Sequence, residues 1–173
     1  MRKKALGTLA AVASAVALML PTSASAASQS TGSTESTRAL TGLSSGHITN
    51  ALFGSGQCLV HFSNGQRGNS PWFYDCLNYD DQTWYFPSVG TTGPIINKYS
   101  LLYMTAQKTG YTPAFLYYNS GYPDQQWTTE DILGSGYVQF RNVNSGECLT
   151  ATPGGIVQQD CIGLPGQRWE LPW

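Results

Sequence analysis

Charged residues are scarce and make up only 11% of the sequence. No basic stripe is present that could neutralise a phosphate backbone, so we expect no binding to nucleic acid. No polybasic cluster follows the first residues that would attract anionic lipid. The sequence also lacks CxxC pairs and the cysteine–histidine spacing of zinc sites. We therefore expect neither a metal nor any other cofactor.

Motifs for catalysis are equally missing. The two histidines, His47 and His61, have no nucleophile motif around them, so we expect them to be structural or solvated. Asp80-Asp81 and Glu130-Asp131 are adjacent carboxylates, but neighbours on a strand face opposite sides, and we expect these pairs in turns. Glycoside hydrolysis needs two carboxylates across a cleft, and no such pair is indicated. We expect that the protein is not an enzyme.

Long apolar runs are confined to the start of the chain. Arg2-Lys3-Lys4 precedes the apolar run Ala5–Leu20, and small residues end the segment at Ala26. This order is typical of a secretory signal peptide, residues 1–26, and predicts a secreted protein. The alternative, a membrane anchor, is disfavoured because no charged stop-transfer segment follows. The chain after residue 26 has six basic and ten acidic residues.

Large apolar side chains are also few in residues 27–46, which are rich in Ser, Thr and Gly. Such a segment buries too little surface to offset its ordering entropy, so we interpret it as a flexible linker. Residues 47–173 then form one domain, which we expect to be a monomer.

Helical periodicity is not evident in this domain. Turn residues recur at short intervals, and the runs between them are rich in aromatic and β-branched residues. Aromatic residues make up 12% of the chain and supply a large apolar surface for a small core. The pattern predicts an all-β domain, with strands at Trp72–Tyr74, Trp84–Phe86, Phe115–Tyr118 and Tyr137–Phe140.

A Gln-x-Trp triplet occurs three times, with tryptophans 43 and 42 residues apart. Repetition at a fixed period indicates structural units that bury a core only together. Because residues i and i+2 share a face of a strand, Gln and Trp should both point inward. The indole would fill the core, and the amide would bond buried backbone. The triplets are Gln82-Thr83-Trp84, Gln125-Gln126-Trp127 and Gln167-Arg168-Trp169.

Four cysteines in an exported chain favour disulfides, and four cysteines permit three connectivities. Cys76 and Cys161 each lie eight residues before the tryptophan of their repeat. Their matching places favour Cys58–Cys76 and Cys148–Cys161, each closing a loop within one repeat. Closing loops of this size contributes about 3 kcal/mol. In the middle repeat, Tyr103 and Asn119 stand at the cysteine positions.

Three such repeats, each with a Gly-x-Cys-Leu-like start, a second cysteine position and Gln-x-Trp, resemble the ricin B-type lectin domain. The resemblance covers residues 47–173 and implies a β-trefoil, with repeats of about 47–88, 89–132 and 133–173. It also implies a secreted module that binds a glycan or glycoconjugate.

Sugar-binding members of that family use a shallow pocket in each repeat. An Asp follows Cys-Leu, an aromatic ring lies before the second cysteine, and an Asn or Asp precedes the Gln of Gln-x-Trp. Carboxylates accept sugar hydroxyls, and flat rings match the C–H face of a pyranose. The resemblance implies these ligand-binding residues in the first two repeats: Trp72, Tyr74, Asp81, Gln82, Phe115, Tyr117, Asp124 and Gln125. The third repeat has Gln159 and Gly166 instead.

The Asp after Cys-Leu is missing from every repeat. Val60, Thr105 and Thr150 stand in its place, and a neutral acceptor is weaker than a charged one. This departure favours an alternative function as a protein-interaction or cell-targeting subunit. The accessory subunits of cytolethal distending toxins are trefoils of that kind, and Tyr137–Val143 is similar to them. Further rings that would contribute an exposed aromatic patch are Tyr111, Tyr118 and Tyr122. A third possibility is an inhibitor that acts through a protruding loop.

Overall fold

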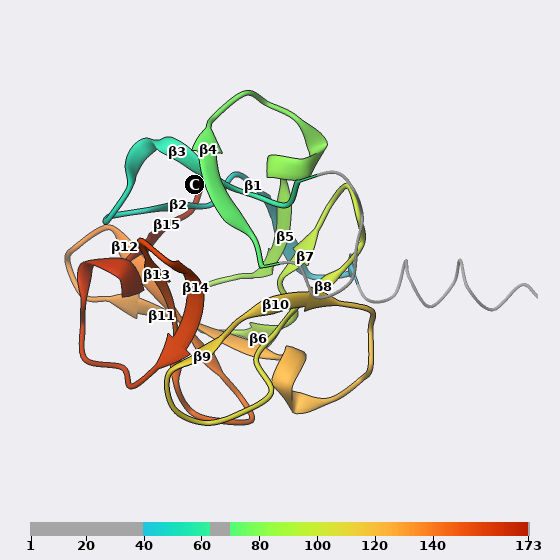
Figure 1. Ribbon diagram of the computed structural model, residues 1–173, viewed down its shortest axis with the longest axis vertical. Helices are drawn as coiled ribbons and strands as arrows, with labels where there is room; N and C mark the ends of the chain where they lie inside the picture. Colours follow the sequence, from blue (N-terminus) through green and yellow to red (C-terminus); the bar gives the residue numbers. More distant parts are fainter. Residues whose placement is uncertain (1–39, 63–69, 173) are drawn as a thin grey trace, which may run out of the picture.

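The computed structural model describes residues 40–62 and 70–172, whose strands surround a common centre (Figure 1). The predicted signal peptide and residues 27–39 of the predicted linker lie outside the described residues. In the described part, no helix has the length and the apolar surface that a membrane crossing requires. The strands are β1 Leu43–Gly46, β2 Thr49–Asn50, β3 Gly54–Val60, β4 Trp72–Asp75, β5 Trp84–Pro87, β6 Thr92–Gly93, β7 Ile96–Asn97, β8 Tyr103–Thr105, β9 Thr112–Pro113, β10 Phe115–Tyr117, β11 Trp127–Ile132, β12 Tyr137–Asn142, β13 Cys148–Thr152, β14 Gly155–Gln159 and β15 Trp169–Glu170. Three 3-10 turns lie between them: η1 Asp80–Gln82, η2 Pro123–Gln125 and η3 Pro165–Gln167.

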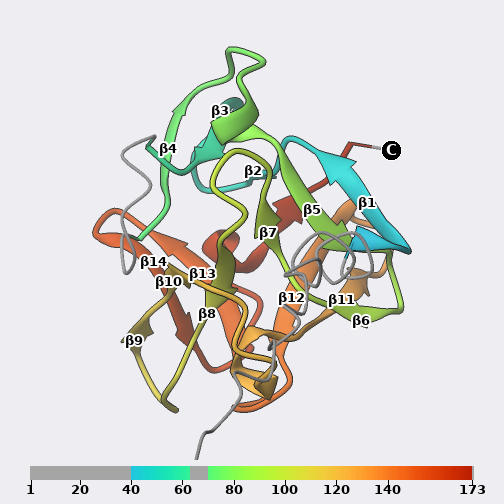
Figure 2. The same cartoon turned by 90° about the vertical axis from the view of Figure 1, so that its right-hand side faces the viewer.

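The strand pairing repeats three times. The second repeat opens with β6 and β7, of which β7 pairs with β5, and the third opens with β12, which pairs with β11. The last strand, β15, returns to pair with β2, which closes the ring (Figures 1 and 2). Each repeat also carries a hairpin: β3–β4, β8–β10 or β13–β14. This arrangement is a β-trefoil, so the predicted all-β fold is confirmed.

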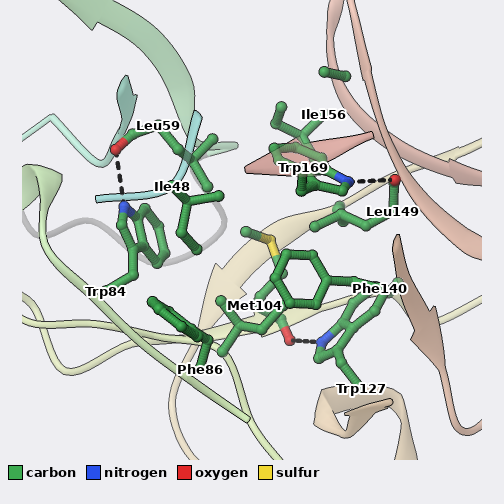
Figure 3. Packing of buried hydrophobic residues seen from close by; sticks show 14 of the residues in the cluster. Ile48, Leu59, Trp84, Phe86, Met104, Trp127, Phe140, Leu149, Ile156 and Trp169 are labelled. Atoms are coloured by element: carbon green, nitrogen blue, oxygen red, sulfur yellow. Dashed lines mark hydrogen bonds between the residues drawn. The ribbon is translucent and has the colours of Figure 1, made fainter. Parts of the chain in front are cut away.

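The tryptophans of the three triplets occupy equivalent places at the centre. Trp84, Trp127 and Trp169 are each 0% exposed. Each indole Nε1 donates to a backbone carbonyl from the first strand of its hairpin (Figure 3). The acceptors are Leu59, Met104 and Leu149, at 2.8, 3.0 and 3.0 Å. The prediction of equivalent, buried tryptophans is confirmed.

Each tryptophan faces a buried asparagine on the neighbouring strand. The pairs in register are Trp84 with Asn97, Trp127 with Asn142 and Trp169 with Asn50. Each asparagine Nδ2 donates to the backbone carbonyl just before the Gln of the adjacent triplet, at 2.8 to 3.0 Å. The asparagines therefore join successive repeats. These asparagines were not predicted from the sequence, although their spacings of 47 and 45 residues are close to the period of the tryptophans.

Both predicted disulfides are present. Cys58 is bonded to Cys76 and Cys148 to Cys161, and each pair has Cα atoms 5.0 Å apart. In the middle repeat, Tyr103 is buried where the first cysteine would stand, as the repeat alignment predicts. Two of the three hairpins are thus covalently closed.

The described fold begins earlier than the sequence suggests. Residues 43–46, which we assigned to the linker, form β1 and pair with β5 from Leu43↔Pro87 to Gly46↔Trp84. A Cβ on Gly93 would approach the Leu43 side chain to 3.2 Å, so β1 packs closely against β6. Composition alone did not reveal this strand, because Leu43 is the only large apolar side chain in it.

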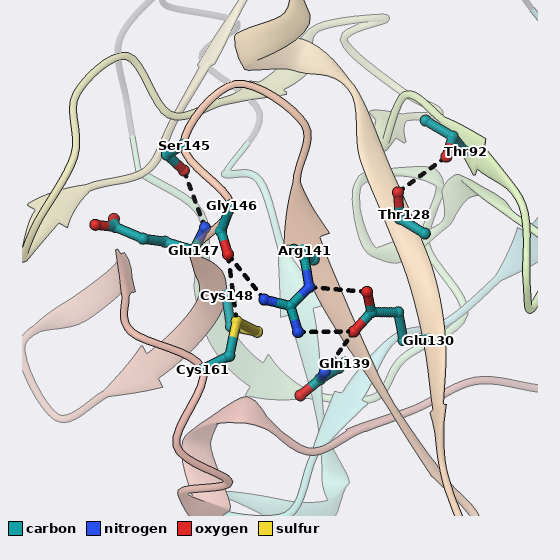
Figure 4. A network of polar contacts seen from close by, with 10 residues as sticks. All are labelled: Thr92, Thr128, Glu130, Gln139, Arg141, Ser145, Gly146, Glu147, Cys148 and Cys161. Atoms are coloured by element: carbon teal, nitrogen blue, oxygen red, sulfur yellow. Dashed lines mark hydrogen bonds and ion pairs between the residues drawn. A yellow bond between two sulfur atoms is a disulfide. The ribbon is translucent and has the colours of Figure 1, made fainter.

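A polar network holds the long hairpin β11–β12. Glu130 accepts from Arg141 Nε at 2.8 Å and from Gln139 Nε2 at 2.5 Å (Figure 4). The hydrogen bond from Arg141 lowers the pKa of the Glu130 carboxyl. Arg141 also donates to the Gly146 carbonyl at 2.9 Å, which links the hairpin to the turn before Cys148. Glu130 and Asp131 both belong to β11, so the expectation that they occupy a turn is wrong.

Candidate functional site

In each repeat, the hairpin and the adjacent 3-10 turn carry the three positions of the predicted sugar pocket. The ring predicted to stack on sugar lies opposite the first cysteine position, since Tyr74 pairs with Cys58 and Tyr117 with Tyr103. In the third repeat, Gln159 pairs with Cys148 at the same place. The residue before the Gln of each triplet comes from the 3-10 turn beside the hairpin. The repeat alignment made from sequence therefore matches the strand register.

The first repeat combines an exposed ring with a half-buried carboxylate. Tyr74 is 50% exposed and lies edge-on to Phe62, with ring centroids 6.1 Å apart. Trp72 is half-buried and packs edge-on against Phe53. Asp81 in η1 is half-buried, and no described residue donates to its buried Oδ1 atom. This repeat offers a stacking surface and an unsatisfied acceptor.

The second repeat has the same components. Tyr117 is 37% exposed and contacts Phe115 and Tyr118 edge-on, with centroids 6.3 and 6.0 Å apart. Phe115 also lines a cavity of about 270 Å³ together with Lys108 and Pro113. Asp124 resembles Asp81, because its Oδ1 is buried and receives no hydrogen bond from the described residues. Burial raises the pKa of the Asp124 carboxyl.

The third repeat cannot hold a side chain beside its triplet glutamine. A Cβ on Gly166 would lie 2.1 Å from the Ala151 carbonyl oxygen, which is too close for any other residue. Its hairpin carries Gln159 where the other repeats have tyrosine. The chemistry predicted for a sugar pocket is therefore confined to the first two repeats.

The triplet glutamines are buried and hydrogen-bonded to backbone. Gln82 donates to the Asp75 carbonyl at 2.7 Å and accepts from the Leu77 amide at 2.6 Å. Gln125 makes matching bonds to Tyr118 and Ser120 at 2.8 Å each. Both side chains fix the loop that precedes the 3-10 turn. Their buried amides agree with the inward orientation predicted from the i, i+2 spacing, and neither faces solvent.

The threonines that replace the missing Asp point inward. Gln125 Nε2 donates to Thr105 Oγ1 at 3.0 Å, and Gln167 Nε2 donates to Thr150 Oγ1 at 3.2 Å. Val60 cannot accept such a bond in the first repeat. The position at which the resemblance implies a sugar-binding carboxylate therefore belongs to the core.

His61 follows Val60 and is buried. Its Nδ1 lies 3.1 Å from Ser100 Oγ, which links the first hairpin to the second repeat. Burial lowers the pKa of His61, and the negative charge of Asp81 partly opposes this shift. The sequence predicts that His61 is structural or solvated, but it does not predict this contact across repeats.

His47 lies close to a disulfide. One of its ring nitrogens and the sulfur atoms of Cys58 and Cys76 lie within 4.8 Å of one another. Because the two sulfurs are bonded to each other, neither offers the thiolate that a metal requires. This group therefore does not form a metal site while the disulfide is intact.

Comparisons with known proteins place this geometry in a family. The model of the ricin-type beta-trefoil lectin domain matches residues 44–169. A comparison with curated proteins found no match. Among solved structures, the designed threefold-symmetric protein ThreeFoil is 20% identical with a TM-score of 0.64, and the match covers 73% of this chain and 96% of that protein.

Two natural proteins have the same fold. The hemolytic lectin CEL-III is 24% identical with a TM-score of 0.61, and the match covers 75% of this chain and 30% of the lectin. The Haemophilus ducreyi cytolethal distending toxin is 18% identical with a TM-score of 0.55, covering 72% of this chain and 81% of that chain. This chain spans only 17% of a similar mosquitocidal holotoxin. At these identities the likeness establishes the fold. Together with the family match over residues 44–169, it shows that the chain belongs to the ricin-type β-trefoil lectin family.

Proposed function

We propose that this protein is a secreted, non-catalytic module that binds carbohydrate through its first two repeats. Membership of a lectin family supports the class of ligand. The observation that carries the proposal is the pair of buried carboxylate oxygens, Asp81 Oδ1 and Asp124 Oδ1, which receive no hydrogen bond from described residues. Asp81 and Asp124 are only half-buried as residues, so each carboxylate also presents surface to which a sugar hydroxyl can donate. Each carboxylate belongs to a repeat with an exposed tyrosine.

The affinity of each site should be low. The family's second carboxylate, after Cys-Leu, is replaced by a valine or by a threonine whose hydroxyl is occupied by a glutamine. Each site is left with one carboxylate and one stacking ring. We expect dissociation constants in the high-micromolar to millimolar range, which corresponds to about 4–6 kcal/mol of binding free energy.

A glycan array with residues 27–173 followed by calorimetry tests this proposal. The double substitution Tyr74→Ala with Asp81→Ala should remove the first site, and Tyr117→Ala with Asp124→Ala the second. Gln159→Ala is the matched control in the third repeat and should leave binding unchanged. Tight sugar binding that survives both double substitutions would place the site elsewhere.

A second candidate function rests on the tyrosines of the second repeat. Tyr111, Tyr118 and Tyr122 are exposed, and Tyr117 and Tyr118 have ring centroids 6.0 Å apart. Neighbouring exposed rings often mark a protein-binding surface. A cell-targeting subunit that recognises protein should still attach to cells after their surface glycans have been removed enzymatically. Tyr118→Ser should weaken that attachment, whereas attachment through sugar would be lost on deglycosylation alone.

A further inference from the structure

A cavity of about 450 Å³ lies where the first and second repeats meet. Asn78, Tyr79, Asp80 and Asp81 line one side, from the loop that leads into η1 and from η1 itself. Tyr99, from the turn between β7 and β8, lines the other. None of these residues comes from the hairpin β3–β4. The cavity is therefore distinct from the predicted sugar pocket of Tyr74 and Asp81, hereafter the hairpin pocket, although Asp81 belongs to both.

The backbone on both sides of this cavity is in a conformation that favours glycine. Asn78 and Leu101 each have a φ of 56°, and they are the only non-glycine residues with positive φ in the described chain. Asn78 lines the cavity, and Leu101 lies in the same turn as Tyr99. Leucine is disfavoured in this region because its Cβ crowds the following carbonyl oxygen. Backbone strain of this kind is concentrated at functional sites.

The other repeats use glycine at both positions. The residue six before the triplet tryptophan is Asn78 in the first repeat, and the residue four after the buried asparagine is Leu101 in the second. Their equivalents all have positive φ: 70° and 74° at Gly121 and Gly163, and 84° and 74° at Gly54 and Gly146. At the junction beside the cavity, by contrast, residues with side chains occupy both positions although their φ angles are positive.

The groups around the cavity suit an uncharged sugar ring. Tyr79 is 61% and Tyr99 55% exposed, so each can present a flat face to ligand. The Asp80 carboxylate is held by Lys98 Nζ at 2.8 Å, so its charge is balanced at the rim. The Asn78 amide and the Lys98 ammonium can donate to sugar oxygens, and the Asp81 carboxylate can accept a sugar hydroxyl.

We propose that this cavity is a second saccharide-binding site, outside the hairpin pockets, which takes one ring of a neutral oligosaccharide between Tyr79 and Tyr99. Its class of ligand rests on the proposed carbohydrate-binding function. Because Asp81 borders both the cavity and the hairpin pocket, an oligosaccharide bound to the first repeat extends from one into the other. The first repeat should therefore prefer disaccharides to single sugars.

Calorimetry with residues 27–173 tests this site. The probes are galactose, xylose and mannose, together with lactose, xylobiose and mannobiose. Tyr79→Ala and Tyr99→Ala should each weaken disaccharide binding about fivefold or more through the loss of stacking. The matched control is Leu164→Ala, which truncates the exposed side chain at the position equivalent to Tyr79 in the third repeat. It should have no effect, because Leu52 stands where that repeat would need a counterpart of Tyr99.

A second pair of variants tests why the strained residues are kept. Asn78→Gly and Leu101→Gly should leave the melting temperature unchanged or raise it, because glycine adopts this conformation without strain. If the side chains serve binding, both variants should still weaken disaccharide binding. Variants that lower the melting temperature and bind disaccharide normally would show that the side chains serve stability, and would overturn the proposal.

Tyr74→Ala separates this site from the hairpin pocket. If Tyr74→Ala abolishes binding while Tyr79→Ala and Tyr99→Ala have no effect, the cavity is not a site and the proposed function stands. If binding survives Tyr74→Ala but is lost in Tyr99→Ala, the cavity is the site and the hairpin pocket of the first repeat is not. If none of the six probes binds the unmodified protein, both proposals are overturned.

Discussion

Replacing Asn97 with alanine should destabilise the fold, because this amide joins the first repeat to the second. Its Nδ2 donates to the Asp81 carbonyl at 2.8 Å, and its Oδ1 accepts from the backbone and hydroxyl of Ser100 at 3.1 and 3.2 Å. Each bond contributes about 1 kcal/mol, so we expect a loss of about 3 kcal/mol in the free energy of unfolding. The Asp81 carbonyl keeps its bond from the His61 amide at 3.0 Å, which limits the cost.

Asn50→Ala provides the comparison at the equivalent position. The Asn50 side chain makes two bonds, to the Gly166 carbonyl at 3.0 Å and from the Leu52 amide at 3.0 Å. Its loss should cost about 2 kcal/mol. Urea unfolding followed by tryptophan fluorescence measures both values, with the disulfides intact. If Asn97→Ala costs no more than Asn50→Ala, the hydrogen bonds of the amide do not set the stability of the junction.

Three further predictions concern single side chains. Trp127→Ala should lower the free energy of unfolding by about 3–5 kcal/mol in urea titration, and a cost below about 1 kcal/mol would contradict a central role in the core. Burial lowers the pKa of His61 below 6.5, so below that pH the unfolded chain binds a proton that the native state resists, and stability falls with acidification. His61→Ala should reduce the difference in melting temperature between about pH 7.5 and about pH 5, and an unchanged difference would refute this source. Burial raises the pKa of Asp124, so its charged form is disfavoured in the native state, and Asp124→Asn should be more stable than the unmodified protein at neutral pH. That advantage should disappear as the pH falls through the raised pKa, and an advantage that persists there would point to a cause other than charge.

The period of the sequence predicted the fold because the tryptophans are both repeated and chemically distinctive. Trp84, Trp127 and Trp169 each fill a place that no smaller side chain would fill, so their spacing is easy to read. The asparagines at 50, 97 and 142 carry nearly the same period, yet asparagine is common in turns. Only the strand register shows that each faces a tryptophan and joins two repeats.

The candidate site could be predicted in part. The alignment of repeats placed Tyr74, Tyr117 and Gln159 correctly at one position, because all three are counted from the same landmarks. Whether a hydroxyl at Thr105 faces solvent or the core depends on the neighbouring Gln125, which a one-dimensional pattern does not reveal. Contacts between repeats were missed for the same reason.

The cavity between Tyr79 and Tyr99 is the feature that is hardest to predict from the sequence. Its two sides belong to different repeats, so neither a motif nor a spacing within one repeat contains it. The replacement of glycine by Asn78 and Leu101 becomes informative only when the threefold equivalents and their φ angles are known. A sequence shows which residue stands at a position, but the strain of that residue is a property of the folded backbone.

The pairing of β15 with β2 has a consequence for folding. Thr49 and Glu170 lie side by side in the ring but are 121 residues apart along the chain. Contacts of such high sequence separation must overcome a large loop-closure entropy, and folds that depend on them form slowly. The barrel cannot close until β15 is available to pair with β2. Until then the sheet keeps unpaired strand edges, and such edges are prone to aggregation.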